Sequence, residues 1–134
     1  MTGPTDLGTV LVVDDEPQIV AFVRLALEDE GYAVATASDG TEALVALDAM
    51  AERSAWPHLI LVDLRMPGMD GKTFVRTYRE RAAAMGTPPA PVIVFTASRV
   101  PAEDAAALGA EGVLRKPFQV DALLDAVARF LKTN

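Results

Sequence analysis

Five side chains able to do chemistry together stand at, or directly after, the ends of short apolar runs. They are Asp14, Asp15, Asp63, Thr96 and Lys116. If those runs are parallel strands of one sheet, their carboxyl ends lie along the same edge, where such sheets bind ligands. We therefore expect residues that are far apart in the sequence to form one site.

The acidic members of this set predict a divalent cation. Three carboxylates brought close together raise each other's pKa unless a cation compensates for the repulsion. Mg²⁺ fits better than Zn²⁺, because the chain has no cysteine and its one histidine, His58, precedes an apolar run instead of following one. We assign His58 no role. Since Mg²⁺ usually completes its coordination with water and phosphate oxygens, a phosphoryl group is expected beside it.

The same residues predict phosphoryl transfer. A carboxylate such as Asp63 can attack phosphorus and form an acyl phosphate. Lys116 and Thr96 would offer an ammonium and a hydroxyl to the phosphoryl oxygens, where negative charge accumulates.

Each assignment has a simpler alternative. Asp14 or Asp15 could cap a helix, and Asp63 could start a turn. Thr96 could be an ordinary strand residue and Lys116 a solvated charge. The shared strand-end positions favour function for the full set. Asp70, which lies in a loop rich in glycine, is instead interpreted as part of the loop geometry.

The segments that must position these residues alternate between strands and helices. The apolar runs predict strands at 10–13, 32–37, 59–62, 92–95 and 113–114. Helices are expected from Pro17 to Gly31, from Thr41 to about Met50, around Phe74, Val75 and Tyr78, at about 102–108, and from Val120 to Leu131. Inward-facing residues are predicted in the first helix (Ile19, Phe22, Val23, Leu27), the second (Leu44, Leu47) and the last (Val120, Leu123, Leu124, Val127, Leu131). Continuous β-branched runs fit strands covered on both faces, so we predict an α/β fold with a doubly wound, five-stranded parallel sheet and five helices.

Composition narrows the class of protein. At 134 residues, with 51% hydrophobic and 23% charged residues, the chain fits one globular domain. Its net charge of −7 argues against direct binding of nucleic acid. No apolar run approaches the roughly 20 residues of a membrane span, and the first residues lack the pattern of a signal peptide. We therefore expect a cytoplasmic protein with no membrane partner.

Four motifs together identify a family. They are Val-Val-Asp-Asp-Glu-Pro at 12–17, Leu-Val-Asp-Leu-Arg-Met-Pro-Gly-Met-Asp-Gly at 61–71, Phe-Thr-Ala-Ser at 95–98 and Lys-Pro-Phe at 116–118. With them, the chain resembles the receiver domains of two-component response regulators over nearly its whole length. That resemblance implies a flavodoxin-like sheet with strand order 2-1-3-4-5.

The resemblance also implies a role for each site residue. Asp63 would be the phosphoacceptor, and Asp14 and Asp15 would hold Mg²⁺ directly or through water. The backbone carbonyl of Arg65 would supply another oxygen to the metal. Thr96 would bind and report the phosphoryl group, Lys116 would pair with it, and the small Ala97 would leave room for the donor. A cis peptide is expected between Lys116 and Pro117.

Partners and domain limits follow from the same family. The phosphodonor would be the phosphohistidine of a sensor histidine kinase or phosphotransfer protein, or a small acyl phosphate, and the phosphorylated form would switch binding to a downstream effector. A phosphorylation-dependent homodimer through the last two helices and final strand is a further expectation. The domain is expected at 9–132 after a tail at 1–8, with no output domain. Such a module is a signalling domain that supports its own phosphotransfer and dephosphorylation, not an enzyme.

One position departs from the family pattern. Val113 stands where relatives often have Tyr or Phe, so we predict that phosphorylation repositions the Thr96 loop and the following short helix without a ring rotation. Arg65 and Ser98 occupy variable positions that modulate dephosphorylation in this family.

Two other function classes fit parts of the pattern. A Mg²⁺-dependent phosphohydrolase also uses an Asp nucleophile, but the sequence has no room for a substrate-recognition cap. An interaction module without phosphorylation would not need the full set of three aspartates, a threonine and a lysine.

Overall fold

The computed structural model describes residues 8–53, 56–66, 68–96 and 109–131. Its strands are β1 (Thr9–Val13), β2 (Ala33–Ala37), β3 (Leu59–Asp63), β4 (Val92–Thr96) and β5 (Gly112–Arg115). Its helices are α1 (Pro17–Glu30), α2 (Gly40–Glu52), α3 (Gly71–Ala84) and α5 (Val120–Phe130). The helix expected at 102–108 lies outside the described residues. Within the described part, no helix is long and apolar enough to cross a membrane.

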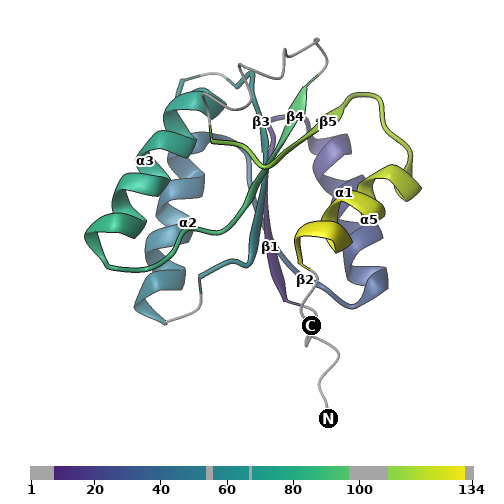
Figure 1. Ribbon diagram of the computed structural model, residues 1–134. Coiled ribbons are helices and arrows are strands. Elements are labelled where there is room, and N and C mark those ends of the chain that lie inside the picture. Colours follow the sequence, from purple (N-terminus) through teal and green to yellow (C-terminus); the bar gives the residue numbers. More distant parts are fainter. Residues whose placement is uncertain (1–7, 54–55, 67, 97–108, 132–134) are drawn as a thin grey trace.

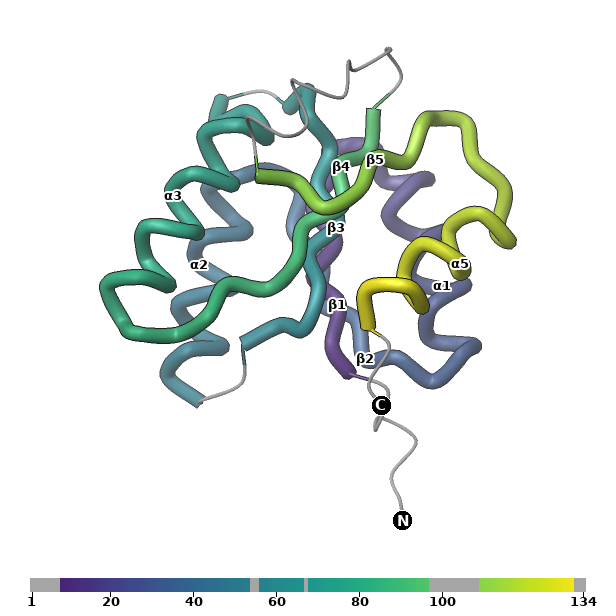
Figure 2. The backbone as a smooth tube through the Cα atoms, in the orientation of Figure 1, coloured from purple at the N-terminus to yellow at the C-terminus, as the bar shows by residue number. Residues whose placement is uncertain are grey.

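The strands form a single parallel sheet covered on both faces. Its order is β2-β1-β3-β4-β5, and every neighbouring pair is parallel. Helices α1 and α5 lie on one face and α2 and α3 on the other (Figure 1). The tube view in Figure 2 shows the same three layers, with the sheet between the two pairs of helices. The predicted fold class and strand order are therefore confirmed.

The core is divided by the sheet into two clusters. Alternate residues of a strand point to opposite faces, so Leu11 packs toward one cluster and Val12 toward the other. The α2 and α3 side is filled by large side chains such as Phe74 and Tyr78. The α1 and α5 side contains buried residues at helical spacing (Val23, Leu27, Leu123, Val127). Burial on both faces explains why the central strands are continuous apolar runs.

Two residues predicted to face inward are instead among the exposed large hydrophobic residues. Phe22 is 40% exposed, although its ring lies 6.1 Å from that of Phe118, and Val120 is 39% exposed. Val23, the neighbour of Phe22, is the residue that packs against the sheet, in the buried cluster on this face. Val120 opens α5 beside the short edge strand β5. Helical periodicity selects a face of a helix but not how far the neighbouring elements extend over it.

The helix ends match the residue types found there. Pro17 is the first residue of α1, and Gly31 ends that helix with a φ of 106°. Asp39 caps α2 by accepting a hydrogen bond from the Glu42 N–H at 2.8 Å. Asp70 caps α3 in the same way, with the Thr73 N–H at 2.9 Å, and this bond lowers its pKa. The structural interpretation of Asp70 is therefore confirmed.

His58 also has a structural contact. Its ring Nδ1 accepts a hydrogen bond from the Thr9 N–H at 3.0 Å, and its main-chain N–H donates to the Thr9 carbonyl at 2.8 Å. The residue ties the start of β1 to the residue before β3, at the end of the sheet away from Asp63.

Candidate functional site

The strand-end residues meet at the carboxyl edge of the sheet. Asp14 follows β1, Asp63 ends β3, Thr96 ends β4 and Lys116 follows β5. The sheet register places these ends side by side, since Asp63 pairs with Phe95 and Thr96 with Arg115. Of the residues that the structure describes, Asp14, Thr96 and Asp63 are the buried polar or charged ones. Buried carboxylates need compensation, so their neighbours decide what this site can do.

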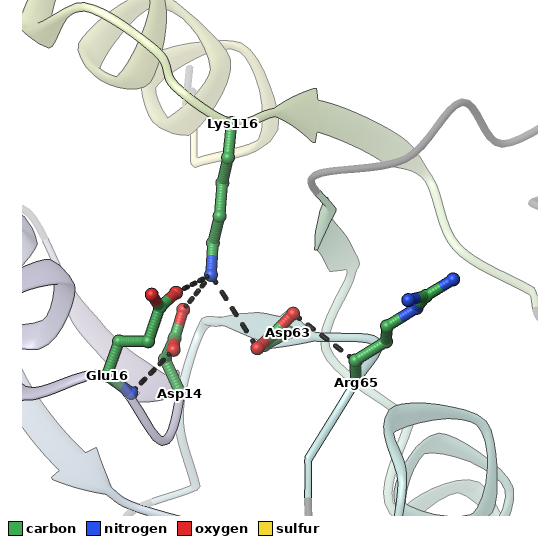
Figure 3. Close-up of polar contacts among 5 residues, drawn as sticks. All are labelled: Asp14, Glu16, Asp63, Arg65 and Lys116. Carbon is green, nitrogen blue, oxygen red and sulfur yellow. Dashed lines mark hydrogen bonds and ion pairs between the residues drawn. The ribbon is translucent and has the colours of Figure 1, made fainter.

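The Lys116 ammonium lies among three carboxylates (Figure 3). Its Nζ is 2.8 Å from Oδ2 of Asp14, 2.8 Å from Oε1 of Glu16 and 3.6 Å from Oδ2 of Asp63. The lysine side chain is 11% exposed, whereas that of Glu16 is 55% exposed. Lys116 is thus an internal counter-ion that reaches the site from the far end of the sequence.

The main chain holds Lys116 in place. Its N–H donates to the Thr96 carbonyl at 2.7 Å, which joins the ends of β4 and β5. The Lys116–Pro117 bond is cis, as expected. Phe118 then packs its ring 5.1 Å from that of Phe95. The lysine is therefore positioned by a loop anchored on both sides.

Burial and charge shift two pKa values in this cluster. Burial would lower the pKa of Lys116, but its contacts with Asp14 and Glu16, together with the attraction of Asp63, raise it overall. The pKa of Asp63 is raised, first by burial and then by repulsion from Asp14. Lys116 and a hydrogen bond from the Arg65 N–H, at 3.3 Å to Oδ1, only partly oppose this rise. The ionised form of Asp63 is therefore disfavoured here, and a bound cation would stabilise it.

The donor set fits a hard divalent cation. One carboxylate oxygen each from Asp14, Glu16 and Asp63 lie within 4.8 Å of one another. Among the described residues, Oδ2 of Asp14 faces the Lys116 ammonium at 2.8 Å and has no other partner. Oxygen ligands of this kind suit Mg²⁺.

A small cavity opens beside this cluster. It has a volume of about 280 Å³ and is lined by Asp15, Glu16, Asp63, Arg65 and Lys116. The space is large enough for a cation with part of its water shell and a phosphoryl group. Asp63 is therefore within reach of a small reactant that enters from solvent.

Not every predicted residue lies at the centre of the site. The structure brings together Asp14, Asp63 and Lys116, with Thr96 buried at the adjoining strand end. Asp15 is exposed and borders the cavity. The predicted roles of Ala97 and Ser98, and the movement expected for the segment after Thr96, lie outside the described residues.

Glu16 is the site residue to which the sequence interpretation assigned no role. Its N–H donates to Oδ1 of Asp14 at 2.9 Å, and its side chain reaches Lys116. The available signal was its position, two residues after Asp14 and directly before Pro17. Nothing local in the sequence indicates contact with a lysine 100 residues away.

Comparison with known sequences identifies the family. A family model described as "Response regulator receiver domain" matches residues 10–128. The C4-dicarboxylate transport transcriptional regulatory protein DctD of Pseudomonas aeruginosa is 39% identical, with 98% of this chain and 27% of the relative covered. The DNA-binding response regulator MtrA of Mycolicibacterium smegmatis is 32% identical, with 93% and 51% covered. The chain therefore spans only about a quarter to a half of the length of these relatives.

Solved structures agree with this result. The chemotaxis protein CheY4 of Vibrio cholerae matches with a TM-score of 0.76 and 36% identity, covering 91% of this chain and 97% of that one. The response regulator TrrA of Thermotoga maritima, in complex with Mg²⁺-BeF, matches with a TM-score of 0.73 and 30% identity over the same shares. Sequence, sheet topology and the acidic strand-end site agree, and the chain belongs to the receiver domains of two-component response regulators, which are phosphoacceptor signalling domains.

Proposed function

We propose that Asp63 is the phosphoacceptor of this receiver domain. The observation that carries the proposal is the position of Lys116, whose ammonium lies 3.6 Å from Oδ2 of Asp63 at the side of an open cavity. A carboxylate with a cation beside it can attack phosphorus while the developing charge on the phosphoryl oxygens is stabilised.

The proposed reaction transfers a phosphoryl group from a phosphohistidine to Asp63. An oxygen of Asp63 forms a bond to phosphorus as the phosphorus–nitrogen bond breaks, and the electron pair leaves with the imidazole. Lys116 pairs with a phosphoryl oxygen, and the Thr96 hydroxyl is assigned to another. The donor is a sensor histidine kinase or phosphotransfer protein, and a small acyl phosphate can replace it.

We assign the Mg²⁺ site to Asp14, Asp15, Asp63 and the backbone carbonyl of Arg65. Support comes from the all-oxygen cluster, which contains Asp14 and Asp63 together with Glu16, and from the Mg²⁺-BeF complex of TrrA. When bound, Mg²⁺ would neutralise charge shared by the carboxylates and the phosphoryl oxygens. Asp14 is a buried member of this cluster, while Asp15 is exposed and lines the adjoining cavity.

The phosphorylated form is proposed to change affinity for a downstream effector in the cytoplasm. The negative charge of a phosphoryl group would attract the Lys116 ammonium and the Thr96 hydroxyl. Thr96 ends β4 and Lys116 follows β5, and a main-chain hydrogen bond joins the two residues. A homodimer that forms on phosphorylation is one form this output could take. Sedimentation of the phosphorylated and unphosphorylated chains would distinguish a dimer from a monomer.

Intact mass spectrometry after exposure to acetyl phosphate tests the phosphoacceptor directly. The expected result is one added phosphoryl group that requires Mg²⁺ and is lost in Asp63→Asn. Asp70→Asn is the matched control, because Asn also caps helices well and Asp70 lies at the start of α3. No adduct and no binding of beryllofluoride would favour an interaction module without phosphorylation. Steady turnover of external phosphoesters would favour a phosphohydrolase.

A further inference from the structure

Glu16 and Lys116 form a contact whose two main chains are both held in place. The Glu16 N–H donates to Asp14, and its carbonyl accepts from the N–H groups of Ile19 and Val20 in the first turn of α1. The Lys116 N–H donates to the Thr96 carbonyl. The 2.8 Å contact between Glu16 and Lys116 therefore joins two anchored segments, and rotation of the side chains is enough to break it.

The Lys116 ammonium has three N–H donors and is already close to three carboxylates. A phosphoryl oxygen on Asp63 would need one of these donors. Asp14 is a costly partner to lose, because its side chain is 0% exposed and would keep an uncompensated charge. The Glu16 side chain is 55% exposed, so its carboxylate regains water when the lysine leaves.

Resting on the phosphoacceptor role proposed for Asp63, we infer that Glu16 is a positioning residue that holds Lys116 until a phosphoryl group on Asp63 takes the lysine from it. Glu16 keeps the ammonium at the edge of the cavity in the unphosphorylated protein. The phosphoryl group then competes with Glu16 for the same donor. Glu16 thereby favours the unphosphorylated state and weakens binding of any phosphoryl mimic.

Beryllofluoride binding at saturating Mg²⁺ tests this competition by calorimetry. Glu16→Gln keeps the length of the side chain but removes its charge, and we expect beryllofluoride to bind about two- to fivefold more tightly. Glu28→Gln is the control, because Glu28 lies on the same helix and pairs with Arg24 instead of Lys116. It should bind beryllofluoride as the wild type does.

A double-mutant cycle separates this role from an effect on the metal or the fold. In a Lys116→Met background, the further change Glu16→Gln should leave beryllofluoride affinity unchanged. Unchanged or weaker binding in the single Glu16→Gln variant would overturn the inference. The same tightening with and without Lys116 would also overturn it.

The ammonium resonance of Lys116 in ¹⁵N NMR gives a second measurement, needed if Lys116→Met binds no beryllofluoride. Glu16→Gln and beryllofluoride binding should each shift this resonance, whereas Glu28→Gln should not. A Lys116 resonance that is not shifted by Glu16→Gln would contradict the inference.

If wild type binds no beryllofluoride with Mg²⁺, the proposed function fails and the competition fails with it. If wild type binds and Glu16→Gln is identical to it, the role of Glu16 alone is wrong.

Discussion

Gly71, the first residue of α3, lies directly against the main chain of Asp63. A Cβ atom on Gly71 would stand 2.6 Å from the carbonyl oxygen of Asp63 and 2.9 Å from Cα of Leu64. The Gly71 N–H also donates to the Leu64 carbonyl at 3.1 Å. The start of α3 therefore supports the proposed phosphoacceptor, and this close approach requires a residue without a side chain.

Gly71→Ala should disturb both stability and phosphorylation. The added methyl group meets main-chain atoms, which cannot rotate away, so the loop at Asp63 must shift. We expect a loss of about 1–3 kcal/mol in the free energy of unfolding, measured in urea, and slower labelling by acetyl phosphate. Lys72→Ala, one residue later and exposed, is the control and should change neither. A fully stable Gly71→Ala variant with normal labelling would contradict this packing.

Asp63→Asn should stabilise the metal-free protein at neutral pH. Burial and repulsion from Asp14 raise the pKa of Asp63, so its ionisation opposes folding. This penalty is absent below the unfolded-state pKa, near 4, and appears as pH rises through the folded-state pKa. We expect the melting temperature to rise by about 2–5 °C at pH 7, with the gain shrinking as pH falls toward 4.

The pKa of Asp70 is shifted in the opposite direction from that of Asp63, so the matched change Asp70→Asn should have the opposite effect on stability. The hydrogen bond from Thr73 lowers the pKa of Asp70, so ionised Asp70 favours the folded state above its unfolded-state pKa. Asp70→Asn should therefore not raise the melting temperature at pH 7. Thermal scans of both variants between pH 4 and 7 check the two signs together, and a gain in both would show that generic charge reduction is responsible.

Lys116→Met should destabilise the metal-free protein and make its stability more dependent on Mg²⁺. Removing the ammonium leaves buried Asp14 and Asp63 without their counter-ion. We expect a loss of about 1–3 kcal/mol in urea unfolding, smaller than for a fully enclosed pair because the site opens into a cavity. Millimolar Mg²⁺ should restore part of this loss. Lys72→Met should show neither effect, and equal behaviour of the two variants would remove Lys116 from the counter-ion role.

Tyr78→Phe should affect stability alone. The Tyr78 hydroxyl, which is buried, accepts a hydrogen bond from the Ala90 N–H at 2.7 Å. Its removal leaves that N–H without this partner and should cost about 1–2 kcal/mol. The ring contact with Trp56, at 5.7 Å between centroids, should persist, so Trp56 fluorescence follows the unfolding. Labelling of Asp63 by acetyl phosphate should be unchanged, and an altered rate would reveal coupling between this core and the site.

Much of the fold was predictable because its signals are local. The apolar runs around Val12 and Ile60 match strands that are buried on both faces, and Pro17 and Gly31 mark the ends of α1. Which helix residues are buried in the core was less predictable. Val23 and Leu27 are buried as expected, but Phe22 is exposed, because its burial depends on which elements cover the helix.

The site residues were likewise predictable only in part. Asp14, Asp63, Thr96 and Lys116 could be assigned to one edge of the sheet because each stands at a strand end. Whether Asp15 or Glu16 contacts Lys116 could not be assigned, because both residues follow β1 and the direction of each side chain depends on the tertiary structure. The structure places Asp15 at the rim and Glu16 against Lys116.

By itself, the sequence determined the alternation of strands and helices, the parallel sheet and the edge at which its acidic residues gather. These features depend on hydrophobic periodicity, helix-end residues and strand-end positions, which are encoded within short stretches of chain. Only the tertiary structure decided which carboxylates share the Lys116 ammonium and how closely Gly71 approaches Asp63. Such contacts join distant segments, and their distances depend on the packing of the whole domain.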